Sequence, residues 1–192
     1  MINIFIFSLM TSTTIIGNQN RMETLPCLFC HHYLVLHPMR ILFVCLGNIC
    51  RSPIADGLLR FKAKQNGLDW VIDSAGTESF HIGEAPHLFS QLVCVHHGID
   101  ISDLRARQFT KKDFDNFDII YAMANDVYTN IQSIAASMFD LKSMRKVDYF
   151  LNELYPGCNA SVPDPWYGPE EGYKDVYDLI DKTTTAIINK YK

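Results

Sequence analysis

The chain has 192 residues, of which 48% are hydrophobic and 20% are charged, and its formal net charge is −4. This length fits one globular domain, with or without an appendage. The absence of a lysine or arginine block gives no support to nucleic-acid binding. Six cysteines could form disulfides in a secreted protein, but a domain of this size does not need them, so we expect free thiols in the cytoplasm.

The first 38 residues do not share the pattern of the rest of the chain. They start with "MINIFIFSLMTSTTIIG", which has no positively charged beginning and is too short to span a bilayer, so we expect no membrane insertion. A later stretch matches haem-attachment or zinc-binding patterns through Cys27, Cys30, His31 and His32. Because such short patterns often arise by chance, we expect no metal and no cofactor. We interpret residues 1–38 as an N-terminal extension, either disordered or absent from the mature protein, and residues 39–192 as the domain.

From Met39 on, short apolar runs alternate with segments of helical periodicity. Four runs are expected to be strands: residues 40–45, 70–76, 117–124 and 144–150. Ser52 and Pro53 suit the N-cap and the first position of a helix after the first strand. Later helices are indicated by three apolar sets: Leu88, Leu92 and Val95; Val127, Ile131, Ile134 and Met138; Val176, Leu179, Ile180, Thr183 and Ile187. This alternation predicts an α/β fold of three layers, with helices on both faces of a central parallel sheet.

The turn between the first strand and the first helix has the features of an anion-binding loop. It follows the carboxyl end of a strand, where ligands bind in such sheets, and its N–H groups lead into a helix N-terminus. Gly47 permits a tight turn and Asn48 tolerates a left-handed conformation. Arg51 offers a planar fork to two phosphate oxygens, and these donors favour the thiolate of Cys45 at the start of the loop. The pattern predicts in-line attack of a thiolate on phosphorus.

A structural interpretation of the same residues is that Cys45 is a buried core thiol and Arg51 a surface charge. A cysteine at the end of a strand would by itself favour that interpretation. The joint pattern of a cysteine, five residues, an arginine, a serine and a helix-opening proline is much less common by chance, and it favours the catalytic interpretation.

The stretch "CLGNICRSP" resembles the signature of the low-molecular-weight protein tyrosine phosphatases. The resemblance continues through "DSAG", "GID", "ARQ", "FD" and "DPWYG" and covers residues 39–192. It implies a phosphoric monoester hydrolase with a four-stranded parallel sheet. It also implies a phosphate-binding loop after the first strand, formed by Leu46, Gly47, Asn48, Ile49 and Cys50.

The resemblance also implies a role for each of four side chains. Cys45 is the nucleophile that becomes a cysteinyl phosphate, and Arg51 clamps the phosphoryl oxygens. Ser52 hydrogen-bonds the thiolate and helps it to leave in the second step. Asp164 protonates the leaving phenolate and then activates water, which predicts an acidic, bell-shaped pH optimum.

Some residues that would support the phosphate-binding loop differ from the family pattern. The resemblance implies that Asn48 and Ser74 hold the shape of the loop. Leu104, however, stands where many relatives have a histidine that supports the asparagine, so we expect a loop that is looser or is held by other groups. Ala124 replaces an acidic residue, and Arg107 is either a structural ion-pairing residue or an exposed charge.

Aromatic residues are candidates for the walls of a substrate slot. Phe80, Trp166 and Tyr167 would enclose a flat phosphoaryl ring, although Phe80 and Trp166 could also be ordinary surface or core aromatics. Leu46 and Ile49 would lie at the rim. A relative that cleaves phosphoarginine has threonine at the position of Ile49, so isoleucine favours phosphotyrosine. We therefore expect phosphotyrosine-containing proteins as substrates of a monomer or weak dimer.

The other cysteines raise an alternative function for the chain and an alternative role for Cys50. Thioredoxin-coupled arsenate reductases share the fold, but they use two further cysteines after the middle helix, and residues 95–157 contain none. Cys94 and Cys158 are more simply explained as small hydrophobic residues. Cys50 is either a packing residue or a redox partner that captures an oxidised Cys45 as a disulfide.

Overall fold

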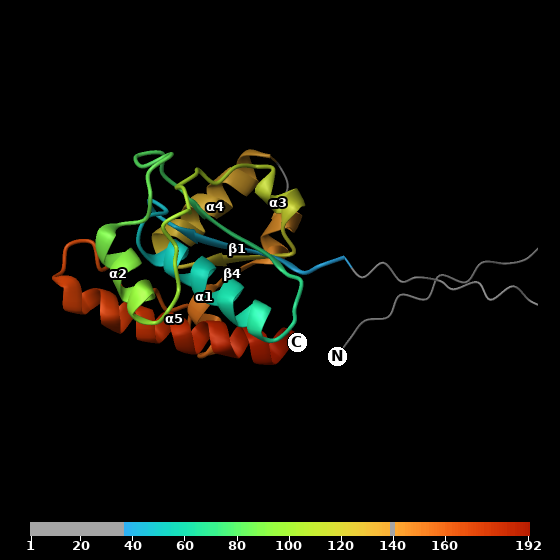
Figure 1. Cartoon of the computed structure of the whole chain (residues 1–192). Helices are drawn as coiled ribbons and strands as arrows, with labels where there is room; N and C mark the ends of the chain where they lie inside the picture. The colour runs from blue at the N-terminus through green and yellow to red at the C-terminus, as the bar shows by residue number, and fades with distance from the viewer. Residues whose placement is uncertain (1–36, 139–140) are drawn as a thin grey trace, which may run out of the picture. The chain divides into compact units, whose positions relative to one another are not determined.

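The computed structural model describes residues 37–138 and 141–192, so the motif at Cys27 and Cys30 lies outside the described residues. Four parallel strands form one sheet in the order β2-β1-β3-β4 (Figure 1). Their bounds are β1 Arg40–Cys45, β2 Val71–Gly76, β3 Ile119–Ala122 and β4 Val147–Tyr149. The parallel four-stranded sheet confirms the predicted fold class.

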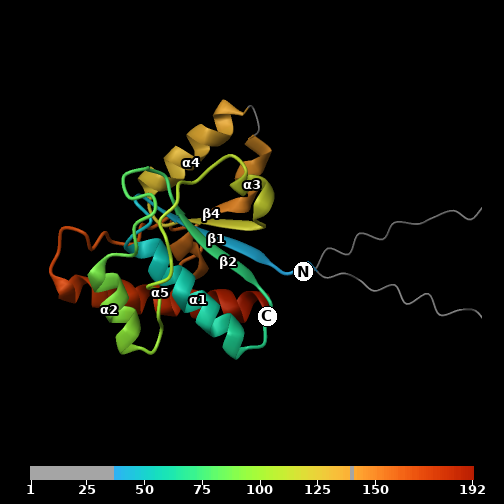
Figure 2. The ribbon, with the colours of Figure 1, turned by 45° about the horizontal axis from the view of Figure 1, so that its top comes forward.

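Helices cover both faces of this sheet, as Figures 1 and 2 show. On one face lie α1 (Arg51–Gln65), α2 (Leu88–His96) and the long C-terminal α5 (Glu170–Tyr191). On the other face lie α3 (Asp113–Asn116) and α4 (Asn125–Ser137). The three layers follow from the strand sequences, because a parallel strand buried on both faces needs an apolar partner on each side.

The central strand β1 shows this double burial residue by residue. Ile41 and Phe43 pack into the core beneath α1 and α5, whereas Leu42 and Val44 pack into the core beneath α4. All four side chains are fully buried. Because successive side chains of a strand point to opposite faces, a run without polar alternation is what this position requires.

The fourth strand is shorter than predicted. Of residues 144–150, only Val147–Tyr149 form β4, and 3₁₀ helices precede and follow it at Leu141–Lys146 (η1) and Phe150–Glu153 (η2). The sequence pattern also does not predict the short helix α3. These short elements contain too few residues for a hydrophobic period to be recognised.

Two helix predictions were wrong in detail. Ser52 is not the N-cap of α1, because the helix starts at Arg51 and Ser52 uses its hydroxyl in the loop described below. In α2, Leu88 and Val95 are exposed, and Ser90, Val93 and Cys94 face inward. The hydroxyl of Ser90 donates to the carbonyl of Cys50, so a small residue rather than a leucine meets the loop.

The strand order determines where along the sheet a ligand site is expected. The chain runs outward from β1 to β2 and then crosses back to β3, so the order reverses beside β1. Ligands of such sheets bind beyond the carboxyl ends of strands at this reversal. The segment before α5 is attached there, because the amide of Val162 donates to the carbonyl of Met123 just after β3 (2.8 Å).

Candidate active site

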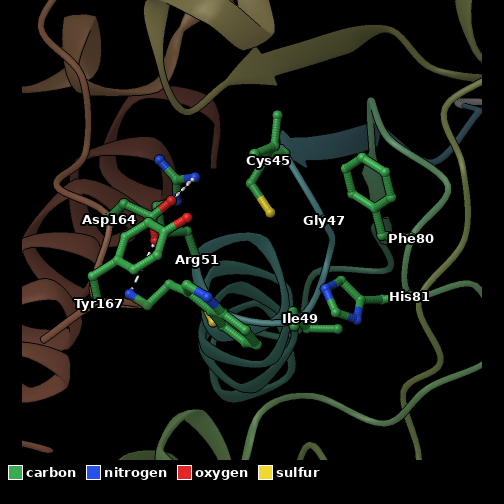
Figure 3. A pocket seen from close by; sticks show the side chains of 11 residues that line it. Cys45, Gly47, Ile49, Arg51, Phe80, His81, Asp164 and Tyr167 are labelled. Carbon is green, nitrogen blue, oxygen red and sulfur yellow. Dashed lines mark hydrogen bonds and ion pairs between the residues drawn. The ribbon is translucent and has the colours of Figure 1, made fainter. Parts of the chain in front are cut away.

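Cys45 is the last residue of β1, and its sulfur points into a cavity (Figure 3). The residue is 2% exposed. Its Sγ accepts a hydrogen bond from the backbone N–H of Asn48 (3.2 Å) and lies 3.0 Å from the Oγ of Ser52. Two hydrogen-bonding groups of the following loop therefore meet at this sulfur atom.

The side-chain amide of Asn48 bonds the same serine hydroxyl. Asn48 has the left-handed backbone expected from the sequence, with φ of 57°. Its Oδ1 accepts from the amide of Arg107 (2.9 Å), so its Nδ2 donates to the hydroxyls of Ser52 (2.9 Å) and Ser74 (3.0 Å). Because the Ser52 oxygen already accepts from Asn48, its hydrogen can point to Cys45. In that arrangement Ser52 donates to the sulfur.

Leu104, which stands where many relatives have a histidine, does not take part in these loop contacts. This residue is partly buried and packs against the core cluster beneath α1 and α5. In this chain the backbone N–H of Arg107 donates to the side-chain carbonyl of Asn48. The guanidinium of Arg107 pairs with Asp73 (2.9 Å) and Asp113 (3.1 Å), so it is an ion-pairing residue. The loop is thus held by other groups.

Arg51 is buried at the first turn of α1, with 5% of its surface exposed. Its Nη2 pairs with the Oδ2 of Asp164 (2.7 Å), and its Nη1 donates to the carbonyl of Val162 (3.3 Å). Among the described residues, its Nε has no hydrogen-bond partner. A buried guanidinium donor without a partner is costly, so this atom favours an anion as ligand.

Asp164 approaches from a distant part of the chain. It lies in the polar loop before α5, two residues after the Val162 that is bonded to the end of β3. The backbone N–H of Trp166 donates to its Oδ1 (3.1 Å). Prolines on both sides, Pro163 and Pro165, stiffen the backbone around the carboxyl group. The carboxylate is 37% exposed and lies beside Arg51 at the wall of the cavity.

The cavity between these groups has a volume of about 210 Å³. Its walls are formed by Cys45, Leu46, Gly47, Ile49, Cys50, Arg51, Phe80, His81, Asp164, Trp166 and Tyr167. All the candidate wall and rim residues from the sequence analysis are among them. Phe80 and Tyr167 are 72% and 94% exposed, so both lie at the mouth. Asn48, Ser52 and Ser74 do not line the cavity and instead support its floor from behind.

His81 is a wall residue that the sequence analysis missed. Its Nδ1 lies 2.8 Å from the Oε2 of Glu84, and its ring lies over Gly47. A Cβ atom added at Gly47 would come within 3.0 Å of the His81 ring, whereas the φ angle of Gly47 is not positive. A side chain at this position would therefore require the His81 ring to shift, whereas the backbone conformation itself does not demand glycine. A single histidine in a loop carries no pattern by which the sequence could indicate it.

Cys50 has different surroundings from Cys45. It packs in a small buried cluster with Ile49, Ala106 and Tyr173. Its Sγ lies 3.5 Å from the hydroxyl of Tyr173. Burial raises the pKa of the Cys50 thiol to about 11, although the hydrogen bond with Tyr173 acts in the opposite direction.

Within residues 37–138 and 141–192, no group of three or more histidine, cysteine, aspartate or glutamate residues could hold a metal ion. In the same residues, no helix is both long and apolar enough to cross a membrane.

The fold and the site together define a parallel α/β protein with a cysteine-arginine loop at the carboxyl end of its first strand. The sequence model of the family "Low molecular weight phosphotyrosine protein phosphatase" matches residues 40–192. The chain therefore belongs to this family, whose members are hydrolases of phosphoric monoesters.

Individual relatives agree with this assignment. The chain is 41% identical to the low molecular weight protein-tyrosine-phosphatase YfkJ of Bacillus subtilis over 142 residues, which cover 73% of this chain and 87% of that protein. It is 38% identical to the low molecular weight phosphotyrosine protein phosphatase of Schizosaccharomyces pombe, over 74% of this chain and 91% of that one. A crystal structure of a protein tyrosine phosphatase from Entamoeba histolytica superposes with a TM-score of 0.71 at 33% identity, covering 79% of this chain and 96% of the other.

Proposed function

We propose that this enzyme hydrolyses phosphotyrosine in proteins through a cysteinyl-phosphate intermediate on Cys45. One observation carries the proposal. A buried sulfur with two hydrogen-bonding partners, a buried guanidinium with a free Nε, and a carboxylate share one cavity.

In the first step the Cys45 thiolate attacks phosphorus, and the bond to the tyrosine oxygen breaks. The N–H of Asn48 and the hydroxyl of Ser52 favour the thiolate because both can donate to the sulfur. Arg51 turns its Nε and Nη2 toward two phosphoryl oxygens, which exchanges its ion pair with Asp164 for a charge-assisted pair with the substrate.

Asp164 supplies the proton for the leaving phenolate. Its position beside Arg51 places the carboxyl group at the side of the cavity away from the sulfur. In the second step the resulting carboxylate takes a proton from water, water oxygen bonds to phosphorus, and the thiolate leaves. Ser52 stabilises the departing thiolate through the bond that it makes to Sγ.

The walls favour a flat ring next to the phosphate. Phe80, Trp166 and Tyr167 lie at the mouth, and Ile49 adds an apolar, 6% exposed surface inside it. These aromatic and apolar side chains suit a flat phosphoaryl ring, which supports phosphotyrosine over phosphoarginine. We place the enzyme in the cytoplasm, because all four cysteines of the described residues are free. We expect it to be a monomer or weak dimer.

The test measures turnover of phosphotyrosine, phosphoserine and phosphoarginine peptides, and of arsenate with thioredoxin. We expect hydrolysis of phosphotyrosine, no turnover by Cys45→Ser, and a fall in kcat/KM of about 100-fold in Asp164→Ala. After acid quenching, the mass of the wild-type Cys45 peptide should include one phosphate.

Cys158→Ser is the matched control, because Cys158 is an exposed cysteine outside the cavity. It should keep the wild-type rate. A normal rate in Cys45→Ser, or dependence of arsenate reduction on Cys158, would exclude the proposed mechanism.

A further inference from the structure

We propose that His87 is a positioning residue that holds Trp166 and, through it, the carboxyl group of Asp164. The inference rests on the proposed function, since it assigns a support to the proposed general acid. His87 does not line the cavity, and no sequence motif contains it.

The ring of Trp166 lies between two histidines from another part of the chain. Its centroid is 5.7 Å from that of His81, at an interplanar angle of 51°, and 5.3 Å from that of His87, at 66°. Trp166 is itself 42% exposed, so burial in the core does not fix it. The two imidazole rings are therefore contacts that can hold this partly exposed side chain in place.

His87 is fixed more firmly than the tryptophan. Its ring stacks on Tyr173 of α5, with centroids 5.3 Å apart and planes at 16°. Its Nδ1 accepts from the amide of Phe89 and so caps α2 (3.3 Å). Its own amide donates to the carbonyl of Ile49 in the phosphate-binding loop (2.8 Å). Burial lowers the pKa of His87, which keeps the stacked ring neutral over a wider pH range.

These contacts connect the loop of the nucleophile with the loop of the acid. On one side, the backbone of His87 is bonded to Ile49, four residues after Cys45. On the other side, its ring contacts the ring of Trp166, and the backbone N–H of Trp166 donates to the Oδ1 of Asp164. When Arg51 turns to a phosphoryl group, this N–H remains as a donor to the carboxyl group. A displaced Trp166 would thus move the acid relative to the leaving oxygen.

Leaving groups of different basicity make this role measurable. A 4-nitrophenolate leaves readily without a proton, whereas a phenolate, which resembles tyrosine, needs one. The ratio of kcat/KM for 4-nitrophenyl phosphate to that for phenyl phosphate therefore reports how well the acid is placed, because kcat/KM reflects the step in which the phenol leaves. A general loss of folded enzyme lowers both values equally and leaves the ratio unchanged.

Two substitutions separate the ring contact from the helix cap. His87→Asn keeps an oxygen that can cap α2 but removes the ring. His87→Phe keeps a ring that can stack but removes the cap. We expect His87→Asn to raise the ratio about tenfold, part of the effect of losing a general acid, and His87→Phe to keep it near the wild-type value.

His97→Asn is the matched control at the other end of the same helix. The ring of His97 stacks on Tyr177 of α5 at 4.2 Å and 17°, but it is remote from the cavity. His97→Asn should leave the ratio of the two kcat/KM values unchanged. An unchanged ratio in His87→Asn, or an increase in His87→Phe without one in His87→Asn, would overturn the inference.

Asp164→Ala separates this inference from the proposed function. If Asp164→Ala raises the ratio and His87→Asn does not, only the role of His87 fails. If Asp164→Ala leaves the ratio unchanged, Asp164 is not the general acid, and both the mechanism and the role of His87 are wrong.

Discussion

At the scale of single residues, two cysteines five positions apart have opposite chemistry. Cys45 has an N–H donor and a hydroxyl at its sulfur, which favour a reactive thiolate. Cys50 is buried beside Tyr173, and its pKa is raised to about 11, so it is a thiol at neutral pH. This difference suits a nucleophile and a partner that reacts only after the nucleophile has been oxidised.

We predict that Cys50 rescues Cys45 from peroxide in a pH-dependent manner. Peroxide converts the Cys45 thiolate to a sulfenic acid, and the Cys50 thiolate then attacks that sulfur, forms the disulfide and releases hydroxide. The folded pKa of about 11 means that the thiolate fraction rises about tenfold per pH unit below this value. The activity recovered with dithiothreitol after a fixed peroxide pulse should therefore increase from pH 6 to pH 9.

Cys50→Ser provides the comparison for this prediction. It should recover little activity at any pH, because its sulfenic acid is oxidised further without a resolving thiol. Cys94→Ser removes a buried cysteine whose pKa burial raises to about 12, and it should recover like the wild type. Equal recovery by the wild type and Cys50→Ser would show that Cys50 is only a packing residue.

At the scale of secondary-structure elements, the end of α5 is fastened to the sheet by one buried carboxylate. The side chain of Glu153 in η2 is 5% exposed. It accepts from the hydroxyl of Tyr121 in β3 (2.7 Å) and pairs with Lys190 of α5 (2.8 Å). Because the Tyr121 ring is fully buried, its hydroxyl depends on this acceptor.

We predict that Glu153→Gln destabilises the fold by about 2 kcal/mol, because the buried carboxylate loses its charge and its hydrogen bonds to Tyr121 and to the exposed Lys190 weaken. Urea unfolding followed by far-ultraviolet circular dichroism measures this loss. Asp178→Asn is the control, since it removes an exposed pair with Lys174 on the same helix and should leave the midpoint unchanged. Equal midpoints for Glu153→Gln and the wild type would contradict a fastening role.

At the scale of the whole molecule, one buried acid makes stability depend on pH. Asp56 of α1 is fully buried and pairs with Arg60, whose side chain is 44% exposed. Burial raises its pKa from 3.8 to about 7 despite the attraction of Arg60. Between these two values the unfolded chain loses the proton while the folded chain keeps it, so folding becomes less favourable as pH rises.

We predict that Asp56→Asn removes this dependence. The melting temperature of the variant minus that of the wild type should increase from pH 4 to pH 7. It should then level off, because above the folded pKa Asp56 is ionised in both the folded and the unfolded wild-type protein. Differential scanning calorimetry at several pH values measures the difference. A constant or falling difference over this range would show that Asp56 is already ionised in the folded protein.

Much of the fold and site could be predicted from local patterns. The double burial of β1 produces an uninterrupted apolar run, and a helix start after a short turn has its own signature, so the sheet and the loop from Cys45 to Ser52 were recognisable. Asn48 was expected in a left-handed conformation and has it. The side chains that form the cavity with Cys45 were expected from a resemblance over residues 39–192, and they line it as a group.

The sequence by itself determined the order of strands and helices and the place of the nucleophile, because hydrophobic periods and turn residues act over a few positions. Only the tertiary structure decided what each polar group bonds to. Ser52 contacts the sulfur and does not cap the helix, the backbone of Arg107 holds the side chain of Asn48, and the ring of His87 contacts Trp166 from 79 residues away in the sequence. Such contacts depend on how distant segments pack, and no local pattern records them.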